Sequence, residues 1–126
     1  MNLIRAGRSL IIHDRRIGSH VFFVLTDPDP ETELVVIVAL VTERAHTERT
    51  VRLDSGDHEF IRHASNVDFG SAKFVPSAKL SAGLARDQAV LSADMSASLL
   101  DKVRNGLIAS SHTANDIVSY CKNMWK

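Results

Sequence analysis

The sequence predicts a single α+β domain over residues 1–126, with a small, strongly bent antiparallel sheet or barrel followed by two C-terminal helices. Two observations support this fold class. The first two thirds of the chain contains short apolar runs separated by turn-forming residues, which is typical of strands. The last third changes to apolar residues at three- and four-residue spacing, which is typical of amphipathic helices. A length of 126 residues suits one hydrophobic core.

The most distinctive run is 34–41, in which eight consecutive residues are apolar and four are valine. Branched side chains pack well on a pleated sheet, so this composition predicts a strand buried on both faces. Thr42 is the first polar residue after it. A side chain at this position stands at the rim of the sheet, where a rigid element can present it to a ligand.

Further strands are predicted around this one. Asp27-Pro28-Asp29-Pro30 separates the run 21–25 from the run 34–41, because proline cannot donate to a strand ladder and Asp-Pro favours turns. This short connection predicts that the two strands are antiparallel neighbours. The remaining strands are expected at 9–12, 50–53 and 73–75, with a short extended piece at 60–61.

Two helices are expected at the C-terminal end. The first has an apolar face formed by Met95, Leu99, Leu100, Val103 and Leu107. Ser92 or Asp94 is expected to cap it. The second is expected to begin at Thr113, with Asp116 three residues further on as in a capping box. Its apolar face is formed by Ile117, Cys121, Met124 and Trp125.

Composition limits the classes of function. Lys+Arg and Asp+Glu balance at 15 each, so bulk charge predicts no preference for nucleic acid or membrane. A single cysteine, Cys121, leaves no partner for an intramolecular disulfide. The N-terminus lacks the apolar segment of a signal peptide, and no apolar run approaches membrane-spanning length. These features predict a soluble, cytoplasmic protein without a membrane partner.

The segment 56–65 concentrates groups that can carry chemistry, including His58, His63 and Ser65. In an extended segment, His58 and His63 point to opposite faces because their positions differ by an odd number, five, so no metal site is expected. Acid–base chemistry by one histidine is one interpretation. The other is a polar loop whose His and Ser side chains hold turns together.

Thr42 and His20 form a second candidate pair. His20 precedes the strand 21–25, and Thr42 follows the strand 34–41, so antiparallel pairing would place both at the same edge of the sheet. The alternative for Thr42 is a strand-end threonine that bonds only to neighbouring backbone.

The order of these elements resembles the MazF/PemK-type toxin family. The similarity begins with Ser19-His20-Val21-Phe22-Phe23-Val24-Leu25, an acidic turn, and a strand that ends at Thr42. It continues in the helical segment from Leu91 to Ser110, which contains Leu99-Leu100-Asp101-Lys102-Val103. In that family an Arg-Pro precedes the first of the two strands, and a threonine ends the second.

The resemblance implies an SH3-like barrel that forms a homodimer and acts as the endoribonuclease toxin of a type II toxin–antitoxin pair. It implies single-stranded RNA as the substrate, an antitoxin protein as a partner, and no metal or other cofactor. Thr42 matches the family threonine, and His20 falls where the family has arginine. Arg15 or Arg16 is expected to reach the same space, and His58, His63 or Ser65 is expected to contact the substrate.

The exchange of arginine for His20 replaces a permanent bidentate phosphate clamp with a titratable group. The opening Gly-Asp-Ile/Val signature of the family is also absent, with Ala6-Gly7-Arg8-Ser9-Leu10-Ile11 in its place. An alternative function is therefore a non-catalytic member of the same fold that binds a protein or nucleic-acid partner. A structural domain without either activity is the third hypothesis.

Overall fold

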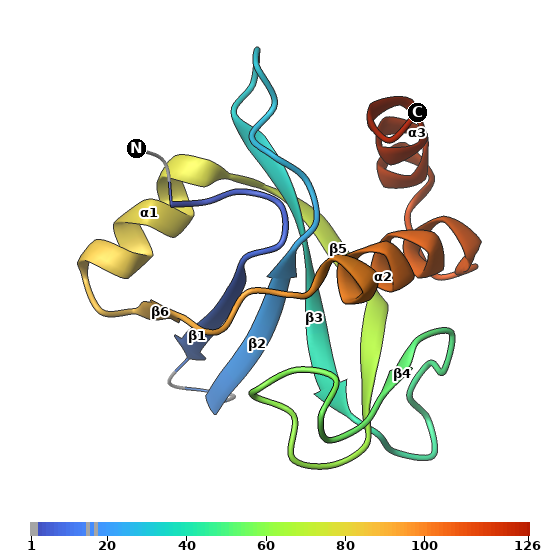
Figure 1. Cartoon of the computed structure of the whole chain (residues 1–126). Coiled ribbons are helices and arrows are strands. Elements are labelled where there is room, and N and C mark those ends of the chain that lie inside the picture. Colours follow the sequence, from blue (N-terminus) through green and yellow to red (C-terminus); the bar gives the residue numbers. More distant parts are fainter. Residues whose placement is uncertain (1–2, 15, 17) are drawn as a thin grey trace.

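The computed structural model describes residues 3–14, 16 and 18–126. These residues form a six-stranded antiparallel half-barrel sheet and three helices, which confirms the predicted α+β class (Figure 1). The strands are β1 (Ser9–Asp14), β2 (Gly18–Val24), β3 (Leu34–Thr42), β4 (Arg52–Leu53), β5 (Ser65–Pro76) and β6 (Ala89–Leu91). The helices are α1 (Ser77–Ala85), α2 (Ala97–Ala109) and α3 (Asn115–Met124). The strands lie in the order β4-β5-β3-β2-β1-β6.

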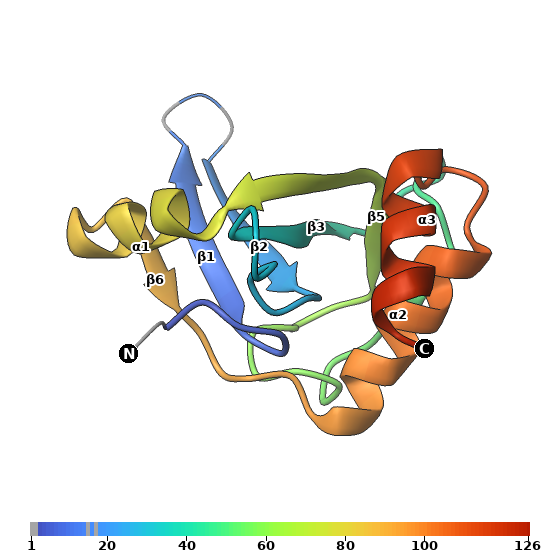
Figure 2. The ribbon, with the colours of Figure 1, turned by 90° about the horizontal axis from the view of Figure 1, so that it is seen from above.

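Strand β3 is buried on both faces, as its unbroken apolar composition predicts. Residues 35–40 are all buried, and they face two separate cores. The larger core lies between one face of the sheet and the helices α2 and α3, whereas the smaller core lies between the other face and α1 (Figure 2). Strands β2 and β3 are antiparallel neighbours, with Val21 opposite Leu40, which confirms the predicted hairpin.

Strand β5 is much longer than the predicted strand at 73–75. Its first half is rich in Ser, Asn, Asp and Gly, residues that are depleted in strands, and this composition concealed it. The alternate residues Val67 and Phe69 are nevertheless fully buried. The ladder between β3 and β5 is irregular between Ile37 and Ala39, where the Ser71 hydroxyl oxygen accepts the Ala39 N–H at 3.0 Å. This irregularity accommodates the bend of the sheet.

The segment between β5 and α2 contains two elements that the sequence pattern did not indicate. Helix α1 and the short strand β6 occupy a region whose scattered apolar residues showed no clear period. The two predicted C-terminal helices are present, but their starts differ from those expected. Ser96, not Ser92 or Asp94, caps α2 by accepting the Leu99 N–H at 3.1 Å. Helix α3 begins at Asn115 after Ala114, which makes no side-chain cap bond.

Candidate active site

Thr42 ends β3 and is held there by pairing with β5. Thr42 lies opposite Ser65 in the antiparallel register, and the Glu43 N–H donates to the Ala64 carbonyl at 3.0 Å. Directly opposite residues project to the same face of a sheet, so the two hydroxyl groups share one side. The predicted position of Thr42 at the rim of the sheet is thus a rigid one.

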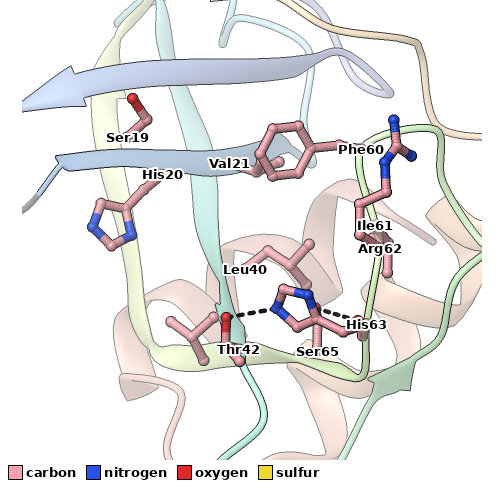
Figure 3. A pocket seen from close by; sticks show the side chains of 11 residues that line it. Ser19, His20, Val21, Leu40, Thr42, Phe60, Ile61, Arg62, His63 and Ser65 are labelled. Carbon is pink, nitrogen blue, oxygen red and sulfur yellow. Dashed lines mark hydrogen bonds between the residues drawn. The ribbon is translucent and has the colours of Figure 1, made fainter.

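The side-chain partner of Thr42 is His63. The Thr42 Oγ1 and the His63 Nε2 are 3.0 Å apart, and the Ser65 hydroxyl donates to the His63 carbonyl at 3.0 Å (Figure 3). A hydroxyl group and an imidazole at this distance share a hydrogen bond, with the donor set by the histidine tautomer. The three residues therefore form a connected polar group in which Ser65 fixes the backbone that carries the imidazole.

This polar group borders a cavity of about 330 Å³. Apolar side chains from β2, β3 and the loop before β5 form part of its wall, and polar groups form the rest. The lining residues are Ser19, His20, Val21, Leu40, Val41, Thr42, Phe60, Ile61, Arg62, His63 and Ser65. An apolar surface with a few convergent polar groups is the usual character of a ligand site.

Two further hollows adjoin the same threonine. One is lined by Thr42, Glu43, Arg44, His63 and Ala64, and the other includes Thr42, Arg44, His46, Asp68 and His112. Among the described residues, Thr42 thus borders three neighbouring depressions. A chain-like ligand crossing the end of β3 would pass this hydroxyl group.

His20 stands at the predicted end of the sheet but on the wrong face to pair with Thr42. Since Val21 lies opposite Leu40, the alternation of side chains puts Thr42 on the face of Val21 and His20 on the other. The ring of His20 points away from the Thr42–His63 pair (Figure 3). His20 contributes to the margin of the Thr42 cavity and also lines a hollow on the opposite face with Phe22 and Lys73.

His58 is buried away from the cavity that His63 borders. Its Nδ1 accepts the Phe60 N–H at 3.1 Å, and its Nε2 lies 2.7 Å from the Ala93 carbonyl oxygen and 3.0 Å from the Ser9 hydroxyl oxygen. The ring also packs edge-on against Phe23. These contacts make His58 an anchor of the loop 54–64, as the turn-holding interpretation of the segment predicted.

The structure also locates the arginine candidates. Arg16 is exposed in the turn between β1 and β2, at the same end of the sheet as Thr42, and Arg15 lies outside the described residues. Arg62 and Arg44 also line the cavities beside Thr42, and neither was among the residues expected at the site. Their closeness in sequence to His63 and Thr42 is the feature that could have identified them from the sequence.

A carboxylate lies immediately beside the candidate site. The Asn66 amide donates to Glu43 at 3.1 Å and, together with the nearby Arg52 and Arg49, lowers the pKa of this carboxyl group. Glu43 therefore favours its ionised form and pairs with Arg49 and Arg52, the second of which also pairs with Asp54. Arg44 and Arg62 line the cavities beside Thr42.

No group of three His, Cys, Asp or Glu residues in the described part of the chain is arranged to hold a metal ion. No helix formed by the described residues has the length and apolar character needed to span a membrane.

The predicted extended piece at 60–61 is a turn in the loop, which allows Phe60 and His63 to face the same cavity.

Comparison with known proteins places the fold among solved structures. No protein-family model matches the chain, and no curated protein sequence matches it. A solved structure described as an endoribonuclease in complex with its cognate antitoxin from mycobacterial species is similar, with a TM-score of 0.54 and 16% identity. The match covers 83% of this chain and 91% of that one. The chain therefore has a fold like that of this endoribonuclease, in agreement with the resemblance found in its sequence.

Proposed function

We propose that this protein is an endoribonuclease that cleaves single-stranded RNA and acts as the toxin of a toxin–antitoxin pair. The observation that carries the proposal is the hydroxyl–imidazole pair of Thr42 and His63, placed over a cavity at the end of β3. The likeness to a solved endoribonuclease supports the same class of reaction.

RNA carries its own nucleophile, and this determines the chemistry proposed. The His63 imidazole accepts the proton of a 2′-hydroxyl, whose oxygen attacks the adjacent phosphorus while the bond to the 5′-oxygen breaks. The leaving 5′-oxygen takes a proton from solvent, so the products are a 2′,3′-cyclic phosphate and a 5′-hydroxyl. Thr42 donates its hydroxyl hydrogen to a non-bridging phosphate oxygen in the transition state. This route assigns no step to a metal ion.

The first test is cleavage of a single-stranded oligoribonucleotide by the purified chain, with and without EDTA. Thr42→Ala and His63→Ala are expected to reduce the rate about 10²-fold or more, because each removes a group used in the transition state. Thr42→Ser is expected to retain most activity. His20→Ala is expected to cost less than His63→Ala, since the two rings project to opposite faces of the sheet.

Two controls test whether the loss of cleavage in these variants reflects the proposed chemistry. An all-2′-deoxy oligonucleotide should remain intact, and the RNA products should end in cyclic phosphate. Thermal unfolding of each variant separates loss of chemistry from loss of fold. Full activity in Thr42→Ala, or cleavage of the deoxy strand, would contradict the mechanism. Loss of activity in EDTA that Mg²⁺ restores would contradict the metal-independent route.

Partners follow from the same proposal. The similar structure contains a cognate antitoxin, and we extend this to an antitoxin for the present chain, acting with it in the cytoplasm. A homodimer is proposed from the family resemblance. Sedimentation at micromolar concentration should give twice the 13.9 kDa mass of one chain. A monomeric mass would reject the dimer without affecting the cleavage chemistry.

A second function is favoured by one observation. The Glu43 carboxylate lies beside Thr42 and pairs with Arg49 and Arg52, which lowers the positive potential expected of a phosphate-cleaving centre. A non-catalytic protein of this fold that binds a protein or nucleic-acid partner is consistent with this charge arrangement. Expression in a bacterial host separates the two functions. Growth arrest with fragmented RNA, abolished by Thr42→Ala, indicates the nuclease, whereas arrest with intact RNA indicates a binding protein.

A further inference from the structure

Phe60 is an exposed aromatic side chain at the edge of the candidate active site. The exposed large apolar residues among those described are Leu3, Phe60, Val90, Leu91 and Met124. Phe60 is the aromatic member of this group, with 41% of its surface exposed, and it lines the cavity that Thr42 and His63 border. An aromatic face left in water beside polar catalytic groups is available to a flat ligand.

The loop that carries Phe60 is held in place on both sides of this residue. The Phe60 N–H donates to the buried His58 ring at 3.1 Å, and the next residue, Ile61, donates its N–H to the His58 carbonyl at 3.0 Å. Ile61 is only 3% exposed and belongs to the larger core. The backbone is therefore fixed while the ring of Phe60 projects outward. Such preorganisation reduces the entropy lost when a ligand is bound.

The cavity beside the Phe60 ring has an apolar surface that suits a base and a polar pair that suits a phosphate. Phe60 extends from the loop towards β2, near Val21, while Thr42 and His63 lie at the other side of the same cavity (Figure 3). Leu40 and Ile61 add apolar surface between them. A base can thus contact the apolar part of the cavity while the attached phosphate reaches the polar pair. Bases stack on aromatic side chains in this manner in single-strand-binding proteins.

We infer that Phe60 is the stacking platform for one unpaired base next to the scissile phosphate, and that His58 is the positioning residue that holds it there. The inference rests on the proposed ribonuclease function. Because the faces of a base inside a duplex are covered by its neighbours, this contact selects single-stranded or looped RNA. The buried His58 thereby gains a role in the site without touching the substrate.

The test measures binding without cleavage. Short single-stranded oligonucleotides carry 2′-fluorine in place of each 2′-hydroxyl and a single 2-aminopurine, in homopolymer and mixed-sequence versions. Stacking on Phe60 is expected to change 2-aminopurine fluorescence when the wild-type chain binds. Phe60→Ala is expected to weaken binding about 5- to 150-fold, which corresponds to ~1–3 kcal/mol for one stacked base. Phe60→Trp should retain affinity, and Phe60→Leu, which is apolar but not aromatic, should not.

Matched variants and substrates distinguish stacking from general stability. Val90→Ala removes an exposed apolar side chain from the far edge strand β6 and should leave binding unchanged. Replacing the stacked base by an abasic site should weaken wild-type binding and abolish the difference between wild type and Phe60→Ala. His58→Gln should weaken binding in a folded protein, with less loss on the abasic strand.

The outcomes separate this inference from the proposed function. Cleavage of RNA with equal binding by wild type and Phe60→Ala overturns the stacking platform and leaves the nuclease proposal intact. Binding that depends on Phe60, without cleavage of RNA by the wild-type chain, supports the platform and overturns the nuclease. Absence of binding to every oligonucleotide overturns the platform, and together with absence of RNA cleavage it overturns both. Equal affinity for a hairpin stem and a single strand also overturns the platform.

Discussion

Gly106 lies in the second half of α2, on the buried side of the helix. A Cβ atom at this position would clash with the Val51 Cγ2 and would stand 2.8 Å from the Phe69 Cζ. Both neighbours belong to the larger core, where side chains have little room to move. The absence of a side chain at Gly106 therefore sets the distance between helix and sheet.

We expect Gly106→Ala to destabilise the protein by about 1–3 kcal/mol, because overpacking exceeds the gain in helix propensity. Gly83→Ala in α1 is the matched control. Its Cβ atom would meet only the Ala89 Cβ at an ordinary 3.7 Å, so this variant should be neutral or more stable by up to about 1 kcal/mol. Urea denaturation of both variants measures the difference. Equal stability of the two would refute the packing argument.

At the site, the sequence pointed to both Thr42 and His63 as candidates but did not predict the hydrogen bond between them. The end of an unbroken apolar run identifies a rim position without any knowledge of tertiary structure. The pairing with His63 depends on the path of the loop 54–64, which is determined by buried bonds from His58 to residues far away in sequence. A residue pattern does not encode those contacts. The sequence placed His20 at the same edge of the sheet as Thr42. The alternation of side chains along β2 puts it on the opposite face.

Among the elements, α2 illustrates how a local bond fixes a boundary. Ser96 accepts the Leu99 N–H, which satisfies one of the donors left unpaired at a helix start. Ser92 and Asp94 are plausible caps in sequence, but the Ser92 N–H donates to the Ser9 carbonyl, which holds this segment beside β1. The tertiary contact thus delays the start of the helix.

Ser96→Ala is expected to lower the free energy of unfolding by about 1 kcal/mol through loss of the cap. Ser92→Ala serves as the comparison, because it removes a hydroxyl from the same segment and leaves the cap intact. Its expected effect is within ~0.5 kcal/mol. Thermal or urea unfolding measures both. A larger loss in Ser92→Ala than in Ser96→Ala would mean that the cap assignment is wrong.

The elements that the sequence predicted well are those with a strong apolar pattern. Helices α2 and α3 bury an apolar face against the larger core, and strands β2 and β3 contribute side chains to both cores. The length of strand β5 was underestimated, because its polar first half lies at the bend of the sheet and beside the candidate site and does not show an alternating apolar pattern. Helix α1 has small residues and a weak pattern, since only Ser77 and Leu80 are fully buried in it.

Across the whole molecule, two carboxylates connect distant parts of the chain. Hydrogen bonds from the backbone of Glu31 and Thr32 and from the Tyr120 hydroxyl lower the pKa of Asp29, which thereby links the β2–β3 turn to α3. Asn66, Arg52 and Arg49 lower the pKa of Glu43, which links the segment after β3 to β5. Both groups favour the folded state in their ionised form.

Folding stability should therefore decrease on acidification. Because the pKa values are lower in the folded than in the unfolded chain, the contribution is complete above the unfolded values near 3.8 and 4.5 and is lost as the pH falls through the folded values. Urea unfolding between about pH 6 and about pH 2.5 measures this decrease. Asp29→Asn should be less stable near neutrality and show a shallower decrease. An unchanged slope in that variant would contradict the assignment.

The attachment of His58 to Ser9 and Ala93 has a consequence for how the protein is made. A ribosome releases Thr42 and His63 well before Ala93, yet the loop that presents His63 and Phe60 lacks its acceptor until Ala93 has emerged. We therefore expect a nascent chain ending before Ala93 to present the candidate active site incompletely formed. If the proposed ribonuclease function holds, such an ordering keeps an incomplete copy inert beside the messenger RNA that encodes it.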